Sequence, residues 1–215
     1  MIQCVVFDMD GVLFDSEALV IQCWEQTAQV HGIPEIREIC HQCLGINADL
    51  TRQMFLEKYG ADFPYDTYKT EMSARYWKNV GEGKLELKPG VREILDALRQ
   101  HGWKTAIASS TRAAVVREEM QHFGLEQMFH EIIGGDMVRR SKPDPEIYLT
   151  ACRALGADPA ETYAVEDSYN GIRAAAAAGM RPVMIPDLLP PTPEIERLTV
   201  KIFPSMAEFQ QFLFQ

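Results

Sequence analysis

The spacing of hydrophobic and polar residues changes twice along the chain, and each change indicates a different kind of structure. Residues 2–7 are a short run of apolar, mostly β-branched side chains that stops at polar residues, which predicts a buried strand. Residues 16–84 are rich in Gln, Glu, Met and aromatic side chains, with breaks at turns that contain glycine or proline. We expect three or four helices in this segment, without a strand, as a unit of their own.

From Pro89 onward, helical and strand patterns alternate. The predicted helices cover 90–101, 112–123, a segment with Asp144 as N-cap and Pro145 as first helical residue that runs to Gly156, and 169–178. The predicted strands cover 103–108, 162–165 and, as the final strand, 181–185, with a short apolar piece at 131–133. Prolines predict a surface loop at 186–194.

These patterns predict an α/β fold with a doubly wound, mostly parallel sheet, because strands that alternate with helices are joined by right-handed crossovers. The expected division is a core domain formed by residues 1–15 and 85–215, with an inserted all-helical domain at 16–84. Ligands in such sheets bind beyond the carboxyl ends of the strands.

Composition narrows the classes of partner. The chain has 215 residues and a formal net charge of −10, with Lys and Arg scattered, which argues against nucleic acid or an anionic membrane as a partner. It has no apolar run of about 20 residues and no signal-peptide pattern, so we expect a cytoplasmic protein. The odd number of cysteines, five, fits reduced thiols. We expect a monomer, with a dimer as the alternative.

Polar clusters follow four of the predicted strands or strand-like pieces. In a parallel sheet these ends lie along one edge, so the clusters should meet there. They are Asp8 with Asp10, Ser109–Ser110–Thr111, Lys142, and Glu166–Asp167–Ser168. Each cluster alone is more often a turn, a helix cap or a solvated loop, but those explanations do not require all four clusters to share one edge.

Together these groups fit phosphoryl transfer. Carboxylates from separate strands can converge on Mg²⁺, which prefers oxygen ligands. Asp8 can attack phosphorus to give an aspartyl-phosphate, and Asp10 can protonate the leaving alkoxide and then activate water. Ser109 and the start of helix 112–123 can donate to phosphate oxygens. Lys142 can add positive charge there or hold the carboxylates together.

At these residues the chain resembles the haloacid dehalogenase superfamily. The matching segments are Asp8–Met9–Asp10–Gly11–Val12–Leu13, Ala108–Ser109–Ser110–Thr111, Ser141–Lys142–Pro143–Asp144–Pro145 and Val165–Glu166–Asp167–Ser168 with Gly171. The resemblance implies a Rossmann-like core, Asp8 as nucleophile, Asp10 as general acid/base, and phosphate binding by Ser109, Ser110 and Lys142. It also implies Mg²⁺ ligation by Asp8, the Asp10 carbonyl and Asp167, with Glu166 as a ligand or a neighbour of the ligands. The segment 16–84 lies where the subgroup similar to β-phosphoglucomutase has a mobile helical cap.

The resemblance also separates the branches of the superfamily. Dehalogenases and phosphonate hydrolases lack the second aspartate, so Asp10 favours phosphoryl transfer. Mutases of the β-phosphoglucomutase type carry a His and an Arg in the cap where this chain has Val20 and Ala48, which favours hydrolysis. Arg52 keeps the mutase alternative open, because it could reach the same region. The expected substrate is a small phosphorylated metabolite, a sugar or polyol phosphate.

Several residues of the helical segment are candidates for the substrate side of the site. They are Ser16, Glu17 and the turn Gly45–Ile46–Asn47, although Asn47 also suits its turn for local reasons. Cys40 and Cys43 form a Cys-x-x-Cys without a second ligand pair, which makes zinc binding or redox chemistry the lesser alternative. Trp24, Tyr76 and Trp77 are expected in the core of the helical segment.

Two other classes of protein share parts of this pattern. A phospho-acceptor signalling module also uses an aspartyl-phosphate, but its aspartate lies on a middle strand and it lacks the helical insertion. A non-catalytic binding protein on the same scaffold would be expected to have lost some of Asp8, Asp10, Lys142 or Asp167, and all four are present.

Overall fold

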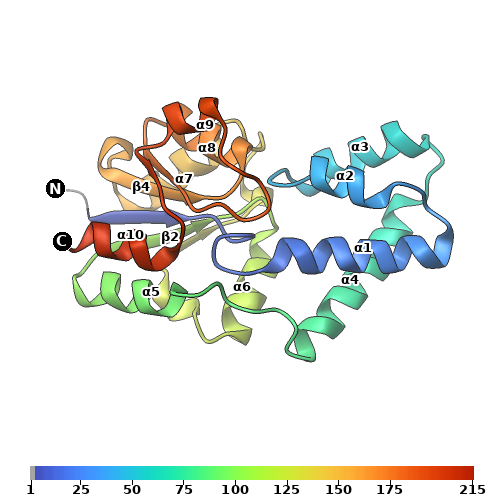
Figure 1. The fold of residues 1–215 in the computed structure, drawn as a ribbon, viewed down its shortest axis with the longest axis horizontal. Helices are drawn as coiled ribbons and strands as arrows, with labels where there is room; N and C mark the ends of the chain where they lie inside the picture. The colour runs from blue at the N-terminus through green and yellow to red at the C-terminus, as the bar shows by residue number, and fades with distance from the viewer. Residues whose placement is uncertain (1–2) are drawn as a thin grey trace.

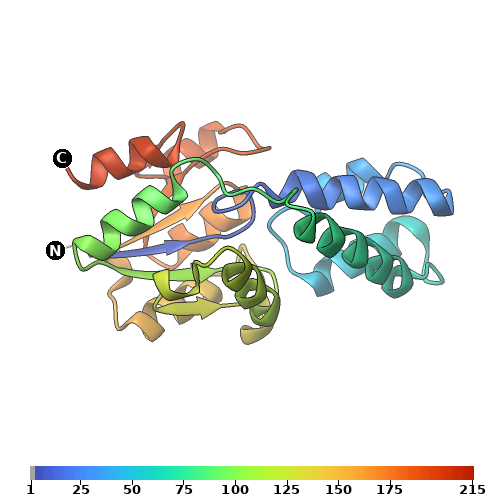
Figure 2. The same cartoon turned by 90° about the horizontal axis from the view of Figure 1, so that it is seen from below.

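A six-stranded parallel sheet forms the centre of the larger lobe in the computed structural model, which describes residues 3–215 (Figures 1 and 2). The strand order is β3-β2-β1-β4-β5-β6, which confirms the doubly wound α/β prediction. The strands are β1 (Cys4–Phe7), β2 (Lys104–Ala108), β3 (Glu131–Ile133), β4 (Thr162–Glu166), β5 (Arg181–Met184) and β6 (Lys201–Ile202). Ile2, where the first strand was predicted to begin, lies outside the described residues.

Helices cover both faces of this sheet, as the alternating side chains of the buried strands require. Val5 and Phe7 of β1 pack on one face with α5 (Val91–Gln100), α6 (Ala113–His122) and α10 (Met206–Leu213). Val6 packs on the other face with α7 (Glu146–Leu155) and α8 (Tyr169–Ala177). The remaining elements of this lobe are α9 (Pro193–Leu198) and the short 3₁₀ helices Glu126–Met128, Gly135–Met137 and Pro159–Glu161.

Four helices between β1 and α5 form the second lobe, without a strand among them (Figure 1). They are α1 (Ser16–His31), α2 (Ile36–Gln42), α3 (Ala48–Tyr59) and α4 (Tyr65–Gly81). Aromatic rings fill their interior, and the ring centroids of Trp24 and Phe55 lie 4.8 Å apart. Trp24 and Tyr76 are buried there, as expected. We call this lobe the helical insert; its division from the core as a domain of its own stays a prediction.

The two connections between the lobes run side by side. Asp15 N donates to Glu86 O at 3.0 Å, Lys88 N donates to Leu13 O at 2.9 Å, and Phe14 pairs with Leu87 in an isolated antiparallel bridge. The start and the end of the helical insert are thereby tied to each other where they leave the sheet.

The C-terminal region departs from the sequence prediction. Strand 181–185 is not the final strand, because β6 pairs with it in parallel, and α9 begins inside the predicted loop 186–194. β6 has only two residues and α9 six, too short for a clear hydrophobic period. The N-cap of α7 is Pro145 rather than Asp144, whose carboxylate accepts from Glu146 N. No helix within residues 3–215 is long and apolar enough to cross a membrane.

Candidate active site

Parallel pairing of β1 with both β2 and β4 brings the predicted polar clusters together. Phe7 lies level with Ile107 on one side and Val165 on the other, so Asp8, Ser109 and Glu166–Asp167 leave the sheet at nearly the same height. Asp8 N continues the ladder by donating to Val165 O at 2.9 Å. The sheet register therefore places the carboxylates of separate strands side by side.

Lys142 joins two of these carboxylates. Its Nζ lies 2.6 Å from Asp8 Oδ1 and 2.6 Å from Glu166 Oε1, and it donates to the Ala108 carbonyl at 3.0 Å. The side chain is 2% exposed. An ammonium has three N–H donors, and all three are engaged. Lys142 therefore holds the carboxylates together, and direct phosphate binding, the other expected role, would require it to give up one of these bonds.

Glu166 has a full set of partners. Tyr148 OH donates to Oε1 at 2.6 Å, and Ser168 Oγ donates to Oε2 at 3.0 Å. A Cβ at Gly171 would overlap the Glu166 carboxylate, so this glycine makes room for it. Tyr148, which sequence reasoning missed, also places its ring 5.1 Å from Lys142 Nζ. These contacts suit Glu166 to fixing Lys142 better than to binding a cation directly.

Two hydroxyl groups orient Asp10. Ser16 Oγ donates to Oδ1 at 2.5 Å and Thr111 Oγ1 donates to Oδ2 at 3.1 Å. Ser16, expected as a substrate residue, is fully buried and instead contacts Asp10. One carboxylate oxygen of Asp10 is therefore held by the first residue of α1, and the other by the loop after β2.

The carboxylates can hold a cation. Oxygens of Asp8, Glu166 and Asp167 lie within 4.8 Å of one another, and Asp167 Oδ2 is buried without a hydrogen-bond partner. Burial raises the pKa of Asp8 to about 8; Lys142 opposes this, while Glu166 and Asp10 add to it. A hard divalent cation fits this all-oxygen donor set and would favour the ionised carboxylates.

The loop after β2 is arranged differently from the prediction. Ser109 is fully buried, and its Oγ accepts from Thr111 N at 3.0 Å. Helix α6 begins at Ala113, whose N–H donates to Asp136 at 2.8 Å and is therefore already engaged. Ser110 borders the pocket and donates to the Gly45 carbonyl at 3.1 Å. The predicted anion site at the helix start is thus partly occupied by the protein's own groups.

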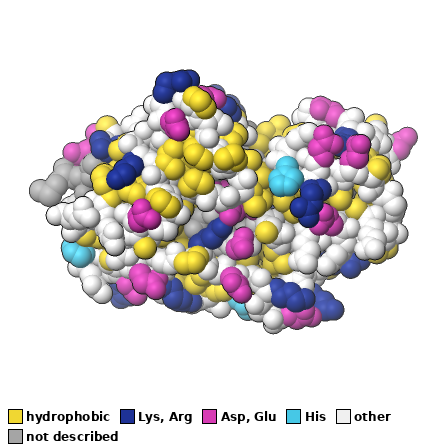
Figure 3. Space-filling view, viewed as in Figure 1, with side chains coloured by type: hydrophobic (Ala, Val, Ile, Leu, Met, Phe, Trp, Pro, Cys, Tyr) yellow, Lys and Arg dark blue, Asp and Glu magenta, His cyan; other side chains and the backbone are white. Residues whose placement is uncertain are grey.

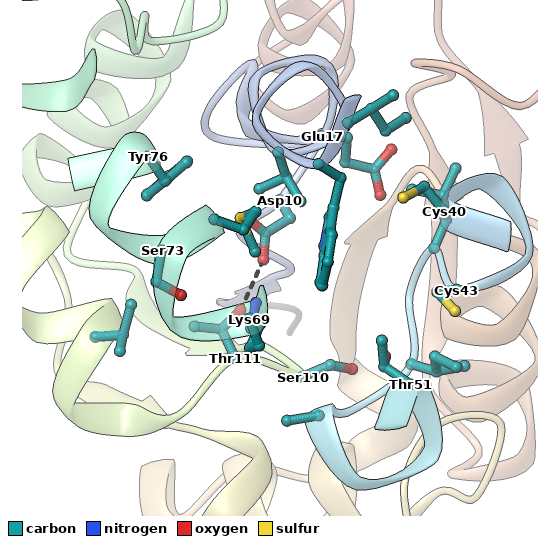
Figure 4. A pocket seen from close by; sticks show the side chains of 18 of the residues that line it. Asp10, Glu17, Cys40, Cys43, Thr51, Lys69, Ser73, Tyr76, Ser110 and Thr111 are labelled. Carbon is teal, nitrogen blue, oxygen red and sulfur yellow. Dashed lines mark hydrogen bonds between the residues drawn. The ribbon is translucent and has the colours of Figure 1, made fainter. Parts of the chain in front are cut away.

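A cavity of about 270 Å³ lies between the carboxyl edge of the sheet and the helical insert (Figure 4). Three acids, Asp8, Asp10 and Glu17, line it. Figure 4 shows Lys69 beside Asp10 and Thr111, and Cys40 and Cys43 across the cavity. Apolar side chains of the insert make up much of the remaining wall, among them Val20, Ile21, Trp24, Leu44, Phe55, Met72 and Trp77.

Three charged residues of this cavity escaped the sequence analysis. The side chains of Lys69 and Arg112 make no hydrogen bond or ion pair with any residue from 3 to 215. Glu119 is 2% exposed, accepts from Tyr76 OH of the helical insert at 2.8 Å, and has a pKa raised to about 8 by burial. All three lie inside helical segments or at a helix start, where polar residues are ordinary, so no local signal distinguishes them.

The turn Gly45–Ile46–Asn47, a candidate for the substrate side, lies against the core. Asn47 N donates to Ser141 Oγ at 3.1 Å, alongside the contact of Gly45 with Ser110. The Asn47 side chain does not line the cavity; it caps α3 by accepting from Leu50 N at 3.0 Å. Local capping therefore explains this residue.

Cys40 and Cys43 are not part of a metal cluster within the described chain. Burial raises the pKa of Cys40 to about 12 and that of Cys43 to about 11, and Cys43 Sγ contacts Met54 Sδ at 3.9 Å. Both thiols are protonated wall residues of the cavity.

Comparisons with known proteins agree with this geometry. The chain belongs to the haloacid dehalogenase-like hydrolase family, whose sequence profile matches residues 5–185. It is 32% identical to a phosphorylated carbohydrates phosphatase of Thermotoga maritima, over 83% of this chain and 82% of that protein. It is 31% identical to the β-phosphoglucomutase of Bacillus subtilis, over 83% of this chain and 80% of that one.

The fold is also similar to that of solved structures over nearly the whole chain. CbbY from Rhodobacter sphaeroides in complex with phosphate superposes with a TM-score of 0.84 at 27% identity, over 97% of this chain and 96% of that one. Family and phosphatase relatives together make this chain an enzyme of the phosphatase class.

Proposed function

We propose that this chain is a Mg²⁺-dependent phosphatase that hydrolyses a small phosphorylated carbohydrate through an aspartyl-phosphate on Asp8. The observation that carries the proposal is that Asp8 and Asp10 line one cavity while Lys142 fixes Asp8 from behind. A nucleophile must be fixed in position and still be reached by the substrate. Asp8 is only 6% exposed, so the substrate can reach it only from the cavity.

The two aspartates divide the chemistry. A carboxylate oxygen of Asp8 forms a bond to phosphorus as the bond from phosphorus to the ester oxygen breaks, and Asp10 gives its proton to the leaving alkoxide. Asp10 then takes a proton from water, whose oxygen attacks phosphorus and breaks the bond to Asp8. Ser16 and Thr111 keep Asp10 in place for both proton transfers.

Mg²⁺ would be held by Asp8 and Asp167, with the Asp10 carbonyl as the third expected ligand and Glu166 fixing the lysine beside them. The cation supplies positive charge that offsets repulsion between the carboxylate nucleophile and the phosphate dianion. The buried, unpartnered Asp167 Oδ2 supports such a site. Lys69 and Arg112 add positive charge on the cavity side.

The cavity wall supports hydrolysis over the mutase reaction. Val20 and Ala48, where the mutases are expected to carry polar groups, both line the cavity and cannot hydrogen-bond a phosphosugar intermediate. Arg52, which kept the alternative open, is half exposed, forms an ion pair with Asp66 at 3.1 Å and does not line the cavity. Water is therefore the proposed acceptor of the phosphoryl group.

The substrate proposal is a sugar or polyol phosphate, supported by the relative from Thermotoga maritima that is named for phosphorylated carbohydrates. A cavity of about 270 Å³ suits a compact molecule. The helical insert would act as a lid over it, because closing lids exclude water and select substrates.

The test is phosphate release from a panel of sugar, polyol and nucleoside monophosphates, with p-nitrophenyl phosphate as a generic ester, with and without Mg²⁺. We expect activity only with the cation and at least about a 10³-fold loss of kcat in Asp8→Asn. Asp15→Asn is the matched control, since this exposed aspartate lies outside the cavity. Full activity in Asp8→Asn, or none of the panel hydrolysed by the unaltered protein, would refute the mechanism.

A further inference from the structure

A second group of carboxylates lies next to the one that includes Asp8. Oxygens of Glu17, Asp167 and Asp187 are within 4.8 Å of one another, so Asp167 belongs to both groups. The three come from different parts of the chain: the first turn of α1, the end of β4 and the loop after β5. Glu17 is 5% exposed and Asp167 1% exposed.

Each of these three residues has one buried oxygen without a hydrogen-bond partner. The atoms are Glu17 Oε2, Asp167 Oδ2 and Asp187 Oδ2. A buried carboxylate oxygen that lacks a partner is costly, and three in one place repel each other as well. Such an arrangement requires a positive charge or a proton among them.

Of the three carboxylates, only that of Asp187 is paired with a cationic side chain of the described residues. Lys88 Nζ is bonded to Asp187 through Oδ1, the oxygen that is not orphaned. Among the described residues, no lysine, arginine or histidine bonds to Glu17 or Asp167.

Gly11 shows that two of the unpartnered oxygens, those of Asp167 and Asp187, lie close to one point. A Cβ at this position would overlap Asp167 Oδ2 and lie 3.2 Å from Asp187 Oδ2. The two oxygens thus occupy the space beside Gly11 that a side chain would need, so only glycine fits there. The φ of +75° at Gly11 also favours glycine. This closeness of the two oxygens to Gly11 is an observation separate from the grouping of the three acids.

We propose that Glu17, Asp167 and Asp187 bind a second divalent cation, Mg²⁺ or Mn²⁺, beside the one assigned to Asp8 and Asp167, with Asp167 shared between them. Three carboxylates from separate segments form the hard, all-oxygen donor set that such ions prefer. Paired sites of this kind hold their ions about 3.5–4 Å apart.

The second cation would join the helical insert to the core. Glu17 belongs to the first turn of α1, whereas Asp167 and Asp187 belong to the sheet loops. Lys88, which holds Asp187, lies in the returning connection between the lobes and also faces Asp15 of the outgoing one at 3.9 Å. Cation binding and the position of the insert are therefore coupled through the same few residues.

The experiment counts ions without any substrate, so its outcome is separate from that of the phosphatase test. The full chain is stripped with EDTA, dialysed and titrated with Mn²⁺, with free and bound ion followed by electron paramagnetic resonance. We expect two Mn²⁺ per chain with a magnetically coupled spectrum. One Mn²⁺ per chain, or two without coupling, would overturn the proposal.

Variants locate the second ion. Asp187→Asn should bind one Mn²⁺ and lose the coupled spectrum, while Asp15→Asn, which also removes an acid facing Lys88, should keep two. An Asp187→Asn protein that keeps two coupled ions contradicts the assignment. Glu17→Gln provides an independent variant with the same expectation, in case one substitution prevents folding as judged by circular dichroism.

Discussion

At the scale of single residues, Lys142 is a buried cation whose partners depend on it. Replacing it with Met leaves Asp8 and Glu166 buried without their counter-charge, so we expect a loss of about 3–5 kcal/mol in the free energy of unfolding and loss of phosphate release. Urea unfolding and the phosphatase assay measure the two effects. Arg140→Met, which breaks an exposed ion pair with Asp144, is the control and should cost less than about 1 kcal/mol. Equal losses in the two variants would show that burial of Lys142 is not decisive.

Glu119 makes stability depend on pH in a predictable direction. Its pKa rises from 4.5 to about 8 on folding, so the folded chain keeps a proton that the unfolded chain releases. This contribution to stability is fully present below about pH 4.5 and is lost as the pH rises toward about 8.

Glu119→Gln removes this titration but keeps the size of the side chain. We expect the free energy of unfolding, measured in urea across that pH range, to fall less steeply in Glu119→Gln than in the unaltered chain. Glu93→Gln, at an exposed position on α5, should leave the slope unchanged. If both substitutions give the slope of the unaltered chain, Glu119 is ionised in the folded state.

Sequence reasoning finds the site residues that follow strands and misses those that reach the site from helices. Asp8, Lys142 and Asp167 stand out because they follow apolar runs or strand ends that parallel pairing brings together. Tyr148 and Glu119 give no such signal, since a helix contains many polar positions and only packing decides which of them turns inward. Ser16 shows a related limit: the sequence singles it out as a candidate on the substrate side, but its partner, Asp10, could be identified only from three-dimensional contacts.

At the scale of elements, α8 contains a glycine that helix propensity alone would disfavour. Gly→Ala in a helix ordinarily stabilises by about 0.5–1 kcal/mol. A Cβ at Gly171 would overlap the Glu166 carboxylate, so Gly171→Ala should destabilise the protein and lower activity by displacing Glu166 from Lys142. Urea unfolding and the phosphatase assay test this. Gly81→Ala, at the end of α4 with open space around it, should be neutral or stabilising. A stable, active Gly171→Ala would mean that Glu166 can move without consequence.

Element boundaries were predictable where hydrophobic periods are long and less so where elements are short. The sequence places β1–β5 and α5–α8 within one or two residues, because buried parallel strands and amphipathic helices leave opposite patterns. β6 escaped because two residues cannot show a period, and it is held by pairing with β5 rather than by its own propensity. Strand order likewise depends on crossovers between distant segments, which local patterns do not encode.

At the scale of the whole molecule, the distribution of charge bears on which partners the protein can bind. Figure 3 shows acidic and basic side chains interspersed over the visible face, with no continuous basic region. The positive charge relevant to a phosphate ester lines the cavity, at Lys69 and Arg112, despite the net charge of −10. A local arrangement of a few cations can dominate there because distant charges are screened within about 10 Å.

The contact between the two lobes at Gly45 gives the last prediction. Gly45 has a φ of +73°, and a Cβ there would lie 2.8 Å from Ser168 Oγ, so Gly45→Ala should push the turn away from the core and hinder closure of the helical insert. Closure matters most for substrates that the insert contacts, so we expect kcat/KM to fall by about tenfold or more for the preferred sugar phosphate, but less for acetyl phosphate. Gly32→Ala, also in the helical insert, places alanine at a similar φ of +66° with nothing within 4 Å, and should leave the relative kcat/KM of the two substrates unchanged. Because both variants strain one glycine of the same lobe, only a difference between them in substrate discrimination can be assigned to the contact. Equal losses for both substrates in Gly45→Ala would mean that the turn contributes to stability and has no part in closing the site.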